Sequence, residues 1–152
     1  MKTNKDESLP IISFLGENPD TECGGADVID PIHGAGKFIG VQVIDGPLRY
    51  GKVEFDSGDT FLGDFDEEDS SLRFGTFIYK DGKVVSGVFE DGVLQTGTVQ
   101  FPNGSVVYMR ERFEDGTFDG AMFEINGDWT QGTYKADTFE LVYGARYRKE
   151  EK

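Results

Sequence analysis

The amino-acid sequence predicts an all-β fold: a single elongated, twisted antiparallel meander of about five β-hairpins. Three observations predict it. Short runs alternate polar and apolar residues, as strands with one buried face do. Asp-Gly and Asn-Gly turn signals separate these runs. Glycines also recur at a nearly constant interval along the chain, which indicates a structure built from similar units laid side by side.

The stretch from Gly75 to Gly97 shows one unit in full. Residues 76–80 alternate, with Phe77 and Tyr79 on one side, and this alternation predicts a strand. Asp81-Gly82 then predicts a hairpin with a type I′ turn, which needs positive φ at both central residues. Residues 83–90 return as the second strand, and a further Asp-Gly pair supplies the next turn signal.

The glycine spacing aligns the other units with this one. The first glycines are separated by 24, 22, 23 and 24 residues, and they are Gly51, Gly75, Gly97, Gly120 and Gly144. A second glycine follows seven residues after each of the first four, at Gly58, Gly82, Gly104 and Gly127. A third follows five residues later at Gly63, Gly87 and Gly132, whereas the remaining unit has Met109 there. An aromatic residue comes two positions after this third glycine, at Phe65, Phe89 and Tyr134.

This pattern resembles the MORN repeat, in which a glycine and a glycine-containing hairpin turn precede a tyrosine-any-glycine-any-tryptophan group. The first aromatic position of that group holds Phe61, Val85 or Val107 here, and Phe65, Phe89 and Tyr134 stand where the family has tryptophan. The resemblance covers roughly residues 46–148. It implies a row of antiparallel hairpins that serves as a protein-binding or scaffolding surface without chemistry of its own.

The two ends of the chain are expected to differ from this middle part. Prolines and glycines interrupt residues 1–37, so we expect an irregular N-terminal segment that is able to fold back over the sheet. Residues 38–148 form the expected hairpin domain, and residues 149–152 a charged tail. Within the domain, residues 37–44 are interpreted as half of an incomplete unit at one edge of the sheet, and residues 139–148 as a strand at the other end. No apolar run is long enough for a signal peptide or a membrane span.

Few residues are suited to chemistry. Cys23 and His33 are the only cysteine and histidine, so no internal disulfide, zinc site or catalytic triad is expected, and a reducing, cytoplasmic location is favoured. The acidic run at residues 64–69 offers oxygen ligands for calcium, but it lacks the glycine and glutamate of an EF-hand loop. We interpret it as a solvated connection. The sequence therefore predicts no enzyme, no cofactor, no metal and no catalytic residue; paired carboxylates at Glu111 and Glu124 are the only enzymatic alternative.

The net charge of −14 decides between classes of partner. Nucleic acid and anionic membrane both attract cationic proteins, so the acidic chain disfavours them. A local basic patch remains an alternative, formed by Arg110, Arg112, Arg146 and Arg148. Protein partners are thus expected, in a homo- or hetero-oligomeric assembly.

The alternation divides the candidate binding residues between the two faces of the sheet. The aromatic face is expected to carry Phe55, Phe61, Phe65, Tyr79, Phe89, Phe101 and Tyr134. These rings form either a core enclosed by sheet curvature or a groove for a partner. The opposite face is expected to carry Ile78, Val88, Tyr108, Phe123, Ile125 and Trp129. An apolar patch of that extent indicates either an interface with another protein or a cover made by residues 9–15.

Together these features predict a non-enzymatic structural or scaffold protein, a subunit of a larger assembly. The alternative is an accessory subunit that docks onto and positions an enzyme. MORN-like proteins also occur in large DNA viruses, so the resemblance extends the expected locations to a virion as well as the cytoplasm.

Overall fold

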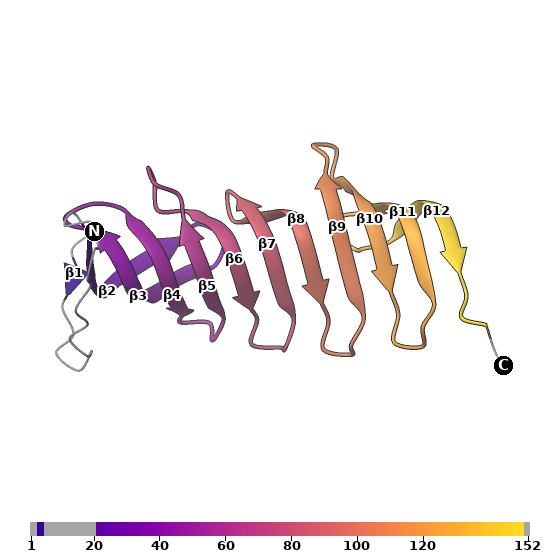
Figure 1. Ribbon diagram of the computed structural model, residues 1–152, viewed down its shortest axis with the longest axis horizontal. Helices are drawn as coiled ribbons and strands as arrows, with labels where there is room; N and C mark the ends of the chain where they lie inside the picture. Colours follow the sequence, from indigo (N-terminus) through magenta and orange to yellow (C-terminus); the bar gives the residue numbers. More distant parts are fainter. Residues whose placement is uncertain (1–2, 5–20, 151–152) are drawn as a thin grey trace.

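A computed structural model describes residues 3–4 and 21–150 of the chain. One sheet contains twelve strands in chain order, each paired antiparallel with its neighbours, and no helix occurs within these residues (Figure 1). The predicted all-β meander is confirmed. The strands are β1 (Thr3–Asn4), β2 (Thr21–Asp30), β3 (Gly34–Val43), β4 (Leu48–Phe55), β5 (Thr60–Phe65), β6 (Leu72–Ile78), β7 (Val84–Glu90), β8 (Val93–Gln100), β9 (Val106–Arg112), β10 (Thr117–Phe123), β11 (Trp129–Lys135) and β12 (Leu141–Tyr147).

A row of glycines sets the register of the sheet. From β2 to β12, each strand places one residue opposite its neighbour in this row. The members are Gly24, Gly40, Gly51, Gly63, Gly75, Gly87, Gly97, Met109, Gly120, Gly132 and Gly144. At Gly63 and Gly75 the backbones approach too closely for a side chain. A Cβ added to Gly63 would lie 2.0 Å from the carbonyl oxygen of Phe74 and 2.7 Å from the Cα of Gly75.

The turns that contain the second glycine share one geometry, which differs from the predicted type I′ turn. Between β6 and β7 the Gly82 N–H donates to Tyr79 O at 2.9 Å, and Tyr79 N–H donates to Lys83 O at 2.8 Å. The loop therefore has three residues, and Gly82 alone takes positive φ, at 99°. The Asp81 side chain accepts the Lys83 N–H at 2.9 Å, which explains the preference for Asp or Asn before the glycine. The type I′ pattern of positive φ instead occurs at Asp91-Gly92.

The expectation of an irregular segment is wrong for residues 21–37, since most of them lie in strands β2 and β3. Their glycines do not interrupt the strands: Gly24 and Gly40 belong to the glycine row, and Gly34 follows the turn with φ 85°. As a consequence β3 is not an edge strand, because β2 and then β1 pair beyond it. The proposed cover by residues 9–15 lies outside the described part of the chain.

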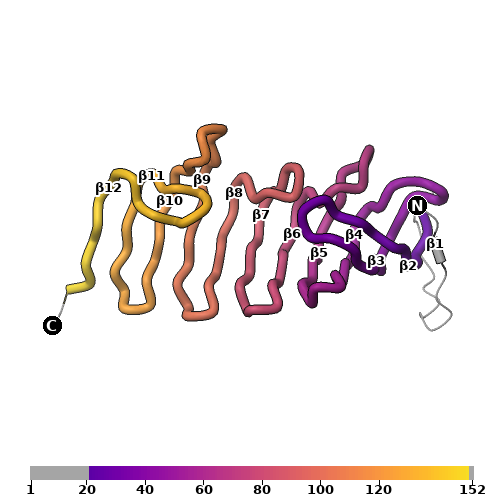
Figure 2. The backbone as a smooth tube through the Cα atoms, turned by 180° about the vertical axis from the view of Figure 1, so that it is seen from behind, coloured from indigo at the N-terminus to yellow at the C-terminus, as the bar shows by residue number. Residues whose placement is uncertain are grey.

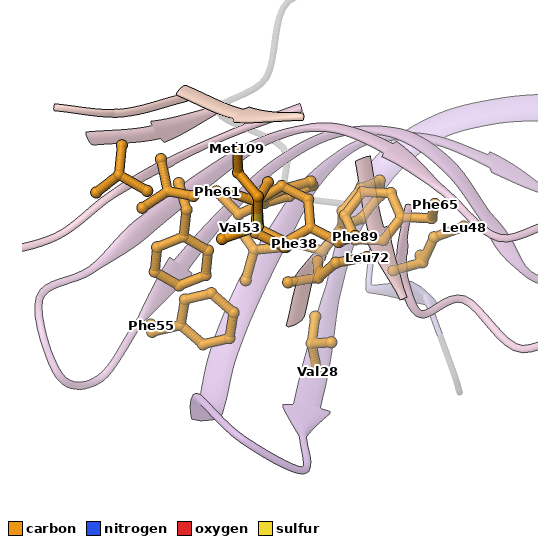
Figure 3. Packing of buried hydrophobic residues seen from close by; sticks show 14 of the residues in the cluster. Val28, Phe38, Leu48, Val53, Phe55, Phe61, Phe65, Leu72, Phe89 and Met109 are labelled. Carbon is orange, nitrogen blue, oxygen red and sulfur yellow. The ribbon is translucent and has the colours of Figure 1, made fainter. Parts of the chain in front are cut away.

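Two segments fold over the aromatic face of the sheet and enclose the core. The β2–β3 hairpin crosses behind β4–β6 in Figure 1 and in front of them in Figure 2. The loop between β11 and β12 turns over the same face at the other end, where Ala136 and Phe139 pack against the core. Rings and aliphatic side chains from successive strands meet beneath these covers (Figure 3). A single sheet thus gains a buried interior on one side.

Candidate protein-binding surface

The aromatic face is the core of the protein. Of the seven residues named as candidates on this face, five are buried, namely Phe55, Phe61, Phe65, Phe89 and Tyr134. The other two, Tyr79 and Phe101, are partly buried and pack against the same cluster. The ring centroid of Phe61 lies 5.6 Å from that of Phe65 and 5.9 Å from that of Phe89. Both ring pairs are edge to face, a favourable arrangement for aromatic side chains. The chain itself fills the contacts that a partner would need here.

The β2–β3 hairpin holds its position on this face through its tip. The His33 ring lies over Phe77 with centroids 4.1 Å apart, and its Nδ1 lies 2.8 Å from the Asp30 carboxylate. Ile32 from the same tip reaches the β7–β8 turn, where its Cδ1 would be 2.9 Å from a Cβ on Gly92. Burial of the neighbouring Tyr79 raises the pKa of its hydroxyl. His33 therefore holds the β2–β3 hairpin against the sheet through its contact with Phe77.

The opposite face is solvated and carries a row of side chains across the strands that are all apolar except one glutamine. Directly paired residues of an antiparallel sheet share a face. The row runs through Ile78, Val84, Gln100, Val106, Phe123, Trp129 and Tyr147. Phe123 is 47% exposed, Tyr147 44% and Ile78 39%, whereas Trp129, Val84 and Val106 are half-buried by their neighbours. Figure 1 looks at this face, which neither the β2–β3 hairpin nor the β11–β12 loop covers.

Three rings at the C-terminal end of the row stack on one another. Phe123 and Trp129 have centroids 5.9 Å apart, Trp129 and Tyr147 have centroids 4.1 Å apart, and the interplanar angles are 17° and 16°. Ile125 in the adjoining turn is 70% exposed. Val88 and Tyr108, at 39% and 45% exposure, belong to neighbouring rows of the same face. The structure thus brings all six opposite-face candidates to one side of the sheet or its adjoining turn.

The two carboxylates considered for chemistry have partners on different strands. Glu111 and Glu124 were both expected on the aromatic face, but Glu111 pairs with Asp119 and so lies on the opposite face. The cause is a β-bulge at Arg110, which shifts the alternation by one residue. Glu124 pairs instead with Arg146 at 3.0 Å. Among residues 21–150, no group of three His, Cys, Asp or Glu side chains is arranged to hold a metal ion.

Two of the four arginines named as an alternative basic patch have partners within the chain. Arg112 donates from Nε to the Leu94 carbonyl oxygen at 2.7 Å, and burial lowers the pKa of its guanidinium. Arg146 lies within 4.0 Å of the Asp128 carboxylate as well as near Glu124. Arg112 therefore contacts a backbone carbonyl and Arg146 contacts carboxylates of the same chain.

One feature of the opposite face was not predicted from the sequence: a hollow of about 490 Å³ over β4–β7. Tyr50, Asp64, Phe74 and Val88 line it, together with Arg49, Glu67 and Arg73. A signal for it was present, because Tyr50, Asp64 and Phe74 are each one residue from a member of the glycine row. Aligning the strands by that row would have placed the three side by side.

No protein-family model matches the chain, and no similar curated protein was found. Within residues 3–4 and 21–150, the structure contains no helix long and apolar enough to span a membrane.

Proposed function

We propose that this protein is a non-enzymatic structural or scaffold protein that binds a protein partner through the opposite face of its sheet. The observation that supports the proposal is the solvated row from Ile78 to Tyr147, in which every member but Gln100 is apolar and Ile78, Phe123 and Tyr147 are exposed. Burial of a Phe or Tyr side chain stabilises an interface by roughly 2 kcal/mol, so leaving several of them in water is costly. A polar row would serve a face that contacts only solvent.

The difference in burial between the two faces of the sheet supports the same proposal. Covers from within the chain protect the aromatic face, whereas the opposite face keeps its rings accessible. The charge of −14 favours a partner with basic groups around its apolar contact. The proposed location is intracellular, with a virion as the alternative.

The test is affinity capture from the native source with the intact chain and a double variant, Ile78→Ser with Phe123→Ser. Both side chains are exposed, so the variant is expected to fold while losing the partner. Ile29→Ser is the matched control, because Ile29 is 82% exposed on the outer side of the β2–β3 hairpin and away from the row. Circular dichroism verifies the fold of each.

Loss of one stoichiometric partner with the double variant, but not with the control, supports the proposal. Equal recovery by all three proteins would contradict it. Mass spectrometry of that partner also separates the two forms of the function. A structural protein indicates a scaffold, whereas an enzyme indicates the accessory subunit.

A further inference from the structure

Two exposed rings flank one carboxylate in the hollow on the opposite face. In the sheet register Tyr50 lies opposite Asp64, and Asp64 lies opposite Phe74, so the three side chains share this face on consecutive strands β4, β5 and β6. Tyr50 is 46% exposed and Phe74 is 54% exposed. The short Asp64 side chain between two long ones leaves a slot above its carboxylate.

The spacing of the strands fixes the width of this slot. Adjacent strands are about 4.8 Å apart, so the backbones beneath Tyr50 and Phe74 are separated by roughly 10 Å. Side chains stand nearly perpendicular to a sheet, so the rings begin from a similar separation. A group midway between them lies about 5 Å from each ring, which is inside the roughly 6 Å reach of a cation–π contact. The same group would lie directly over the carboxylate.

No cation of the described residues occupies this position. Lys52, one residue beyond the glycine row on β4, pairs with Glu54 at 2.8 Å. The cation–π contact seen within residues 21–150 is that of Lys83 over Tyr79, on another part of the molecule. The Asp64 carboxylate makes no ion pair or hydrogen bond to any group within residues 21–150.

The local charge favours a cation over an anion. Two arginines, Arg49 and Arg73, and two carboxylates, Asp64 and Glu67, line the hollow, but with the adjoining loop the acidic residues number five. Those carboxylates are Asp64 in the slot and Asp66, Glu67, Glu68 and Asp69 in the adjoining loop. The chain as a whole also carries a net charge of −14, which favours the approach of cations over anions.

We propose that the slot formed by Tyr50, Asp64 and Phe74 binds the guanidinium or ammonium group of an arginine or lysine side chain of a bound protein. This inference rests on the proposed function, and it names the chemistry that the partner would present. The rings contact the faces of the cation, and the Asp64 carboxylate balances its charge.

The experiment is an NMR titration of the intact chain with the probe peptide Ac-Gly-Gly-Arg-Gly-Gly-NH2. We expect the ring resonances of Tyr50 and Phe74 to shift with saturation. A peptide with citrulline in place of arginine keeps the shape but lacks the charge, so it should leave them unshifted. Asp64→Asn, which keeps the shape of the side chain, should weaken binding roughly fivefold, and Phe74→Ala about threefold.

Two substitutions serve as matched controls. Phe113 is 38% exposed beside the acidic residues of the β9–β10 loop but has no second ring facing it across a carboxylate, so Phe113→Ala should leave the affinity unchanged. Glu114→Gln removes the same charge as Asp64→Asn from that distant loop. If Glu114→Gln weakened peptide binding as much as Asp64→Asn, or if the citrulline peptide shifted the ring resonances equally, the proposed cation site would be refuted.

The peptide titration and the partner-capture experiment can fail independently of each other. If the peptide does not bind while Ile78→Ser with Phe123→Ser still loses the partner, the slot alone is refuted. If the peptide binds the slot but that double variant retains the partner, the slot stands as a cation site and the proposed use of the apolar row falls.

Discussion

At the scale of single residues, the glycine row shows how backbone contact determines which residue a strand accepts. Gly63 has no unusual φ, yet a methyl group on it would overlap the backbone of β6. Gly34 shows the opposite case, with φ 85° and no atom within 4 Å of an added Cβ. Steric exclusion and backbone conformation therefore act at different glycines of the same sheet.

We predict that Gly63→Ala destabilises the protein more than Gly34→Ala does. The first must push two paired strands apart, at an expected cost of about 3 kcal/mol or more. The second only forces alanine into the left-handed region, which costs roughly 1–2 kcal/mol. Denaturant unfolding of both variants measures the difference. A free energy of unfolding that falls equally in both would show that the close approach at Gly63 relaxes without cost.

At the scale of elements, some strands follow directly from the sequence and others do not. The glycine interval predicts the order of β4–β12, and the observed register places those glycines opposite one another. Residues 21–37, which hold β2 and the start of β3, were expected to be irregular because their glycines resemble interruptions when they are viewed without their partners. Only the pairing of Gly40 with Gly51 shows that they continue the row.

The bulge at Arg110 marks a second limit of sequence reasoning. It lies on β9, beside Met109, the member of the row that is not glycine. Elsewhere the register shifts fall at Arg49, Arg73, Gln95 and Val142 on even-numbered strands. A bulge is a property of two paired strands, so the side on which Glu111 projects could not be read from β9 alone.

We predict that His33→Ala loosens the β2–β3 cover while the rest of the sheet stays folded. The substitution removes a side chain that is only 7% exposed, its contact with Phe77 and its bond to Asp30. The expected cost is about 1–3 kcal/mol. Hydrogen exchange followed by mass spectrometry should then show faster exchange in β2 and β3 and little change in β7–β12. Uniformly faster exchange in every strand would contradict the separate role of the cover.

At the scale of the whole molecule, the sheet separates two tasks by face. Curvature and the two covers turn the aromatic face into a core, a possibility that the sequence left open beside a binding groove. The opposite face keeps its apolar row in solvent. Alternation within each strand predicted the apolar members of both faces, but which face is enclosed depends on segments distant in sequence, such as the His33 turn above Phe77.

The most direct test of this division is hydroxyl-radical footprinting of the chain alone and in its native complex. We expect strong labelling of Phe123, Tyr147 and Tyr108 in the isolated protein and protection of these rings in the complex, because they are exposed on the proposed binding face. Phe61 and Phe77 have no exposed surface and should be labelled weakly in both states. Protection confined to partly buried residues of the aromatic face, such as Tyr79 and Phe101, with no change at Phe123 and Tyr147, would contradict the account.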